Sequence, residues 1–138
     1  LRIMSEEAFI LSVFSNIALV PDGGLSWLLA RNIGYSKALE FAIEAKKIGA
    51  QECLQLGIAN RVCSPENLES ETQKWAQAIS MRSPQAVSNT KKIMRDSLEK
   101  KFIQTYEDEA NTQNSILGND EFKEGVAAFF EKRKPVFK

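Results

Sequence analysis

The Pro-Asp-Gly-Gly turn at residues 21–24 constrains the fold more than any other part of this chain. Residues 1–20 are mostly apolar with short strand-like runs, and an amphipathic helix is expected over residues 25–32, with Gly34 as its stop. Continuous apolarity is typical of strands that are buried on both faces. Two adjacent glycines permit the tight turn between strand and helix. The chain is therefore expected to begin as an α/β structure.

The remainder of the chain is predicted to be mostly helical, because helix caps, prolines and glycines divide it into helix-length segments. A brief strand is expected at residues 58–62. Helices are expected from a Ser36 cap through Ile43, from Ala50 to Leu56, after Ser64-Pro65 through Met81, after Ser83-Pro84 through Leu98, from Phe102 to near Gly118, and from Asp120 until Pro135.

Composition narrows the chemistry that such a fold can carry. The 138 residues suffice for one domain, and 18 basic side chains balance 18 acidic ones, which argues against a nucleic-acid partner. The chain has no histidine, which excludes a Ser-His-Asp or Cys-His mechanism within it and any histidine-ligated metal. Proton transfer must then use carboxylates, lysines, tyrosines or water.

The cysteines and the apolar segments indicate the compartment. Cys53 and Cys63 have no CxxC spacing, and two reduced thiols are favoured over a disulfide. No signal peptide opens the chain, and no apolar run reaches the roughly 18 residues of a membrane span. We therefore expect a soluble cytoplasmic protein without a membrane partner.

Asp22 has two interpretations from its position in the turn. As a helix cap, its carboxylate would accept backbone N–H bonds from the helix that opens at Gly23 or Gly24. As a catalytic base, it would have to be shielded from bulk water beside a bound ligand, with apolar neighbours such as Leu19 and Trp27 supplying the dry setting. The catalytic interpretation fails if the carboxylate faces open water or is sealed away from every cavity.

A wider set of residues resembles the crotonase family, also called the enoyl-CoA hydratase/isomerase family. The matching segments follow in order along essentially the whole chain and are most specific between Asp22 and Val62. They are FSNIALVPDGG at 14–24, SWLLAR at 26–31, Gly34 with Ala38 and Glu40, IGAQE at 48–52, GIANRV at 57–62, Ser83-Pro84, Lys91-Lys92, Phe129 and EKRKP at 131–135.

The resemblance implies a crotonase-like α/β fold, a spiral of ββα units followed by helices that form trimers or dimers of trimers. Residues 1–62 would be the C-terminal part of the ββα core, and residues 63–138 the helical oligomerisation region. The family binds acyl-CoA thioesters, so coenzyme A belongs to the substrate, and neither a separate cofactor nor a metal is implied. Two backbone N–H groups stabilise the enolate that forms when a carboxylate removes the α-proton.

Phe14 separates two reactions that the resemblance allows. Hydratases of the family have a glutamate at the position matching Phe14, and phenylalanine neither accepts nor donates a proton. Several isomerases instead have a single carboxylate at the position matching Asp22, which moves a proton from one carbon to another. The resemblance thus favours an enoyl-CoA isomerase. A hydratase, another crotonase-fold lyase or hydrolase, and a non-catalytic oligomerisation fragment stay as alternatives.

Both oxyanion-hole donors of the family, and most of its adenine pocket, come from the half of the fold that precedes the position of Leu1. The resemblance therefore implies that this chain holds the candidate base without the groups that stabilise the enolate. We expect the chain by itself to be inactive.

Several residues are candidates for contact with the substrate. They are Phe14, Pro21, Gly23, Gly24, Trp27 and Lys132. Trp27 is expected to pack in the core or at a subunit interface, and shaping an acyl pocket is the alternative. The resemblance implies that Lys132 reaches the phosphates of coenzyme A, and the alternative is a cation favoured at a helix C-terminus. The aromatic face of Phe122, Phe129 and Phe130 is expected to pack in the core, with a subunit interface as its alternative.

Overall fold

The computed structural model describes residues 1–137, and the chain divides between Gln73 and Lys74 into two compact units. Unit 1 holds all four strands and three of the helices, whereas the segment from Lys74 onward is helical. The helix α4 (Leu68–Ser80) crosses the division. The functional boundary expected after residue 62 stays a prediction.

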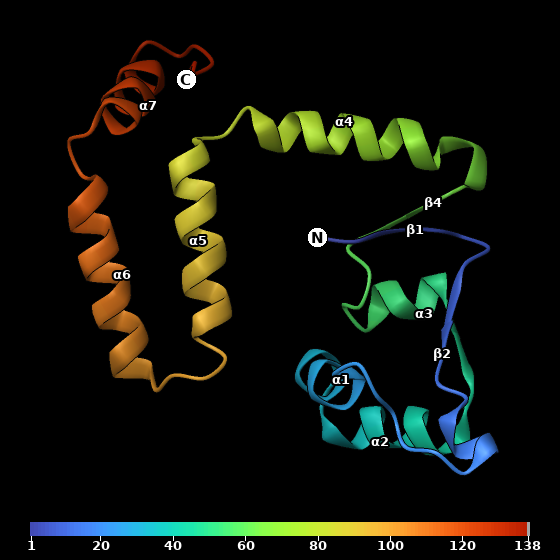
Figure 1. Ribbon diagram of the computed structural model, residues 1–138. Coiled ribbons are helices and arrows are strands. Elements are labelled where there is room, and N and C mark those ends of the chain that lie inside the picture. The colour runs from blue at the N-terminus through green and yellow to red at the C-terminus, as the bar shows by residue number, and fades with distance from the viewer. Residues whose placement is uncertain (138) are drawn as a thin grey trace. The chain divides into compact units, whose positions relative to one another are not determined.

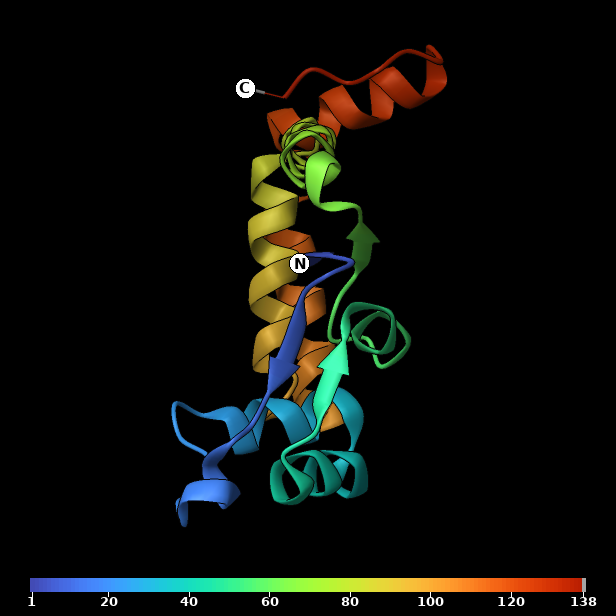
Figure 2. The same ribbon diagram turned by 90° about the vertical axis from the view of Figure 1, so that its right-hand side faces the viewer.

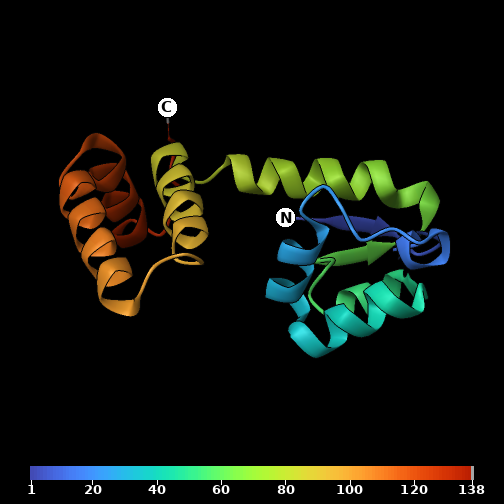
Figure 3. The same cartoon turned by 60° about the horizontal axis from the view of Figure 1, so that its bottom comes forward.

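Four short strands form two separate pairs in unit 1. Strand β1 (Ile3–Ser5) pairs in parallel with β4 (Arg61–Cys63), and Figure 3 shows the two side by side. Strand β2 (Phe9–Leu11) pairs antiparallel with β3 (Lys47–Gly49), as Figure 2 shows. The expected α/β start is therefore present, although the strand β3 had no counterpart among the sequence-based expectations.

The expectation that these strands are buried on both faces is wrong for the described residues. Phe9 and Leu11 of β2 are exposed. Within the β2–β3 strand pair, Ile48 of β3 is the one buried residue. Each strand has one partner, so no strand lies in the interior of a wider sheet. The segment Phe14–Ile17, within the expected strand-rich start, forms a 3₁₀ helix, η1, which ends at Ala18 in the left-handed conformation.

Three helices complete unit 1, namely α1 (Leu25–Ile33), α2 (Tyr35–Glu44) and α3 (Ala50–Gln55). The expected Ser36 cap is wrong, because α2 begins at Tyr35 and Gly34 precedes it. Gly34 has φ 82°, a conformation that glycine adopts without strain. Its N–H closes α1 on the Ala30 carbonyl at 3.0 Å, and its carbonyl opens α2 by accepting from the Ala38 N–H at 3.1 Å.

The core of unit 1 lies where α1, α2, α3 and β3 meet. Its buried side chains are Leu29, Ala38, Phe41, Ile48, Cys53 and Ala59. Helix α1 packs on α2, so the turn that precedes α1 is positioned by this core. Both cysteines are free thiols, and burial raises the pKa of Cys53.

The C-terminal half begins with a short 3₁₀ helix, η2 (Pro65–Asn67), which leads into α4. Three helices follow, α5 (Pro84–Asp96), α6 (Phe102–Ile116) and α7 (Asp120–Phe130). Helices α5 and α6 lie side by side (Figure 1). The helix start expected at Ser83 is confirmed, because the Ser83 Oγ accepts the Ala86 N–H at 2.9 Å.

Hydrogen bonds join the N-terminal ends of α5 and α7. The Ser83 hydroxyl donates to the Glu121 carboxylate, and the Asn119 side-chain amide donates to Gln85. Asn119 also caps α7 by accepting the Phe122 N–H at 2.7 Å. Glu121 thus completes the cap of α5 with a charge that the helix N-terminus favours.

An ion pair holds the segment after α7 against that helix. The two carboxylate oxygens of Glu124 accept from the Arg133 guanidinium at 2.5 and 2.9 Å, and one of them also accepts the Val136 N–H at 2.8 Å. The hydrogen bonds from Arg133 and Val136 lower the pKa of Glu124 from 4.5 to about 2. Helix α7 ends at Phe130, before the expected Pro135, and Lys132 has a left-handed φ of 55°.

The clasp between Glu124 and Arg133 is expected to lose its contribution to stability in acid. Well above pH 4.5 the Glu124 carboxylate is ionised in both the folded and the unfolded state, so its full contribution is present. As the pH falls from 4.5 through about 2, the unfolded state binds a proton first, and the contribution disappears. Thermal melts of the unmodified protein and Glu124→Gln should therefore differ most near neutral pH and converge near pH 2. A melting-temperature difference that stays constant with pH would contradict the clasp.

Candidate active site

The turn at residues 21–24 is built by consecutive left-handed glycines. Gly23 and Gly24 have φ angles of 59° and 82°, which side chains rarely allow, and no heavy atom lies within 4 Å of a Cβ placed on either. The Asp22 carbonyl accepts the Leu25 N–H at 2.9 Å, which closes the turn at the first residue of α1. The turn therefore presents an open backbone surface directly in front of a helix.

Asp22 is exposed at this turn, and its carboxylate has no hydrogen-bond or ion-pair partner among residues 1–137. The helix-cap interpretation is wrong, because Gly24 is the N-cap of α1 and no side chain caps that helix. The Asp22 carboxylate thus lies at the turn without a hydrogen bond to the backbone N–H groups of α1. An unpaired carboxylate at such a position is free to accept a proton.

The dry setting expected around Asp22 is also absent from the described part of the chain. Leu19 is 58% exposed, Val20 is 79% exposed and Trp27 is 41% exposed. The Trp27 ring lies 3.8 Å from the Arg31 guanidinium, a cation–π contact one helical turn along α1. Phe14 is half-buried at the start of η1. These side chains do not shield the carboxylate. Trp27 belongs neither to the buried cluster of unit 1 nor to the lining of the cavity beside α1.

A cavity of about 240 Å³ lies beside α1. Its lining residues are Arg2, Ile10, Leu11, Leu25, Leu28, Leu29, Asn32, Phe41 and Ile58. Arg2 and Asn32 meet there, with Nη2 donating to Oδ1 at 3.2 Å. Sequence reasoning missed this cavity, although the apolar positions of α1 were the signal. It is smaller than typical ligand pockets and does not include Asp22.

Lys132 lies in the other compact unit, exposed and in the left-handed conformation after α7. Its neighbour Arg133 is the partner of Glu124, so the basic segment at residues 132–134 is fixed at one point. The core packing expected for the aromatic face of α7 is wrong for all three members, since Phe122 is also 41% exposed. Phe129 and Phe130 are exposed and meet edge to face, with ring centroids 5.7 Å apart.

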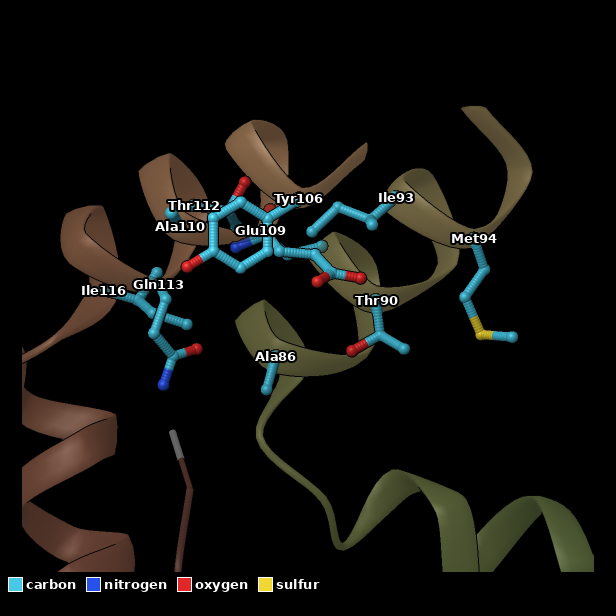
Figure 4. A pocket seen from close by; sticks show the side chains of 11 residues that line it. Ala86, Thr90, Ile93, Met94, Tyr106, Glu109, Ala110, Thr112, Gln113 and Ile116 are labelled. Carbon is cyan, nitrogen blue, oxygen red and sulfur yellow. The ribbon is translucent and has the colours of Figure 1, made fainter. Parts of the chain in front are cut away.

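A larger cavity, of about 550 Å³, lies between α5 and α6 (Figure 4). Its lining residues are Ala86, Asn89, Thr90, Ile93, Met94, Tyr106, Glu109, Ala110, Thr112, Gln113 and Ile116. Small residues on both helices, Ala86 and Ala110, leave the space open. No sequence pattern marks this cavity, because it exists only once the two helices pack.

Residues 1–137 contain no cluster of three metal-ligating side chains. No helix in this described range is long and apolar enough to cross a membrane.

Comparison with known proteins gives a consistent result. The family model for enoyl-CoA hydratase/isomerase matches residues 1–138. The chain is 36% identical over 138 residues to a trans-2-decenoyl-[acyl-carrier-protein] isomerase of Streptococcus mutans, covering 98% of this chain and 51% of that protein. It is 32% identical to the peroxisomal Delta(3,5)-Delta(2,4)-dienoyl-CoA isomerase of Arabidopsis thaliana, covering 99% of this chain and 50% of that protein.

A solved structure agrees in fold. The crystal structure of an enoyl-CoA hydratase from Polaromonas sp. JS666 superimposes with a TM-score of 0.93 at 29% identity, covering 99% of this chain and 53% of that one. The chain spans about half the length of these matches. The crotonase-like α/β class expected from the sequence is confirmed.

Proposed function

The chain belongs to the enoyl-CoA hydratase/isomerase family, and we propose that it carries the proton-transferring carboxylate of an enoyl-thioester isomerase. One observation carries the proposal. Asp22 is an unpaired carboxylate at the turn before α1. The family resemblance supports the proposal, because it implies that Phe14 stands where the family's hydratases have a glutamate. A single carboxylate suffices to move a proton between two carbons, whereas the family's hydration uses two.

In the proposed reaction Asp22 removes a proton from the carbon next to the thioester carbonyl. The electron pair of that C–H bond shifts into a thioester enolate. The protonated Asp22 then returns its proton two carbons further along, and the double bond moves to the position conjugated with the carbonyl. The carboxylate is regenerated, and no atom is gained or lost.

This reaction requires shielding that the described residues do not provide. Asp22 and its neighbours Leu19 and Val20 are exposed, so bulk water would compete for the carboxylate. Because the chain spans about half the length of its relatives, we propose that the cover and the enolate-stabilising N–H groups belong to the rest of the active assembly. A trimer or a dimer of trimers is the assembly that we propose.

The thioester carrier has two candidates. Coenzyme A is the first, since the matching family model and the Arabidopsis relative are described by their CoA substrates. An acyl carrier protein is the second, because the relative that is 36% identical is named for that carrier. Both carriers present the acyl group on a thioester at the end of the same phosphopantetheine arm.

The reaction type is testable with the protein at its natural length. We expect a 3-decenoyl thioester to be converted into the 2-decenoyl thioester of the same mass, because only the double bond moves. Mass spectrometry with chromatographic separation of the two isomers measures this conversion. The 2-decenoyl thioester offered alone serves as the control, since a hydratase would add water to it. A 3-hydroxydecanoyl thioester as the main product would contradict the isomerase and favour the hydratase.

A further inference from the structure

Charge is strongly segregated between neighbouring helices of unit 2. Residues 82–101, which include α5, hold six basic side chains and two acidic ones. Residues 102–121, which include α6, hold five acidic side chains and no basic one. The formal net charge of the whole chain is zero, so it does not reveal this separation of charge. Long-range attraction to a charged partner depends on such local fields rather than on the net charge.

The basic residues of α5 lie on one side of the helix. Successive helical residues are rotated by about 100°, so Lys91, Lys92 and Arg95 share a face about one turn long. We call these three residues the α5 basic face. On the same count Asn89 and Ile93, which line the cavity facing α6, point roughly the opposite way. The α5 basic face is therefore turned away from α6.

The α5 basic face is exposed and only partly neutralised by its own chain. All three side chains are exposed. Lys92 pairs with Asp96 at 2.6 Å, Arg95 lies 3.6 Å from the same carboxylate, and Lys91 has no ion-pair partner within residues 1–137. Lys100 is not part of the α5 basic face, because it forms an ion pair with Asp108 of α6. Asp96 thus pairs with two of the three cations on this face.

The shape of the face selects between classes of anionic partner. Sites for small ligands are concave and enclose most of the ligand. None of the three cations lines the two cavities described above, nor three further cavities of residues 1–137. A convex row of cations along a helix suits the complementary surface of a protein better than a nucleotide phosphate.

We propose that the α5 basic face docks an acidic acyl carrier protein that presents the thioester substrate. This inference rests on the proposed isomerase function and deepens it, because it selects the protein carrier over free coenzyme A. The attraction acts between the three cations and a row of carboxylates on the carrier. It would raise the rate of encounter and weaken with added salt.

The test removes two of the cations from the protein at its natural length. Lys91→Ala/Arg95→Ala keeps the pair between Lys92 and Asp96 and introduces the residue that favours helices most. We expect the Kd for the source organism's fluorescein-labelled holo-acyl carrier protein, measured by fluorescence anisotropy, to rise at least about tenfold. The KM for an enoyl-[acyl-carrier-protein] should rise in parallel, while the KM for the corresponding enoyl-CoA stays unchanged.

The matched control is Lys37→Ala/Lys123→Ala, which removes two exposed cations on α2 and α7 and should leave the carrier's Kd within about twofold. Unchanged carrier affinity in the α5 variant would overturn the proposal. An equal rise in the KM for enoyl-CoA would also overturn the proposal, since the α5 basic face would then bind the phosphates of coenzyme A. Tighter binding to anionic phospholipid vesicles than to the carrier, lost in the same variant, would assign the face to a membrane surface instead. The anisotropy measurement needs no turnover, so an absence of isomerase activity is distinguishable from an absence of docking.

Discussion

The Asp22→Asn variant of the natural-length protein is expected to isomerise enoyl thioesters about 10²- to 10⁴-fold more slowly, which is the usual contribution of a positioned proton-transfer group. Asparagine has nearly the shape of aspartate but does not accept the α-proton. The side chain is exposed and has no partner within the described residues, so the free energy of unfolding should change by less than about 0.5 kcal/mol. Initial rates with a 3-decenoyl thioester and thermal melts of the same preparation measure both effects.

Asp120→Asn is the matched control for Asp22→Asn. Asp120 is also an exposed carboxylate beside a helix start, and its contact with Lys123 is 3.7 Å long. The same chemical change at this position should leave the rate within about twofold. Isomerisation at the unmodified rate by Asp22→Asn would remove this carboxylate from the mechanism. Loss of activity together with a large loss of stability would assign Asp22 to the fold.

Local chemistry made several elements predictable from the sequence. The turn at 21–24 with the helix after it needs only two glycines and an amphipathic pattern. The Ser83-Pro84 start of α5 is equally local, since a serine hydroxyl and a preset proline φ act within one turn. The family resemblance depended on the order and spacing of such short segments and is confirmed over the whole chain.

Non-local pairing explains most of what the sequence did not reveal. Strand β3 is three residues long and exists because it pairs with β2, which lies more than 30 residues earlier. Ser36 has the chemistry of a cap, but Gly34 reverses the chain first and Tyr35 already lies in the helix. The apolar pattern of residues 1–20 could not show how many neighbours each strand finds. Burial depends on those neighbours. The prediction that apolar side chains shield Asp22 from water was therefore wrong for the described residues.

The position of Asp22 depends on a small core, and this gives the second large effect. Phe41 is 5% exposed in α2 and is the largest side chain of the buried cluster beneath α1. Phe41→Ala should cost about 3–5 kcal/mol, because the ring is lost and the neighbouring cavity grows. A loss of that size is a large share of the stability of a typical domain. Urea denaturation followed by circular dichroism measures it.

Phe102→Ala is the control for Phe41→Ala, since Phe102 is 85% exposed at the start of α6 and its removal should cost less than about 0.5 kcal/mol. Because α1 packs on α2, unfolding caused by Phe41→Ala would also release the turn that holds Asp22. Activity and stability should then fall together, whereas Asp22→Asn separates them. A Phe41→Ala variant with unchanged urea midpoint would show that the buried cluster is not the core on which the turn depends.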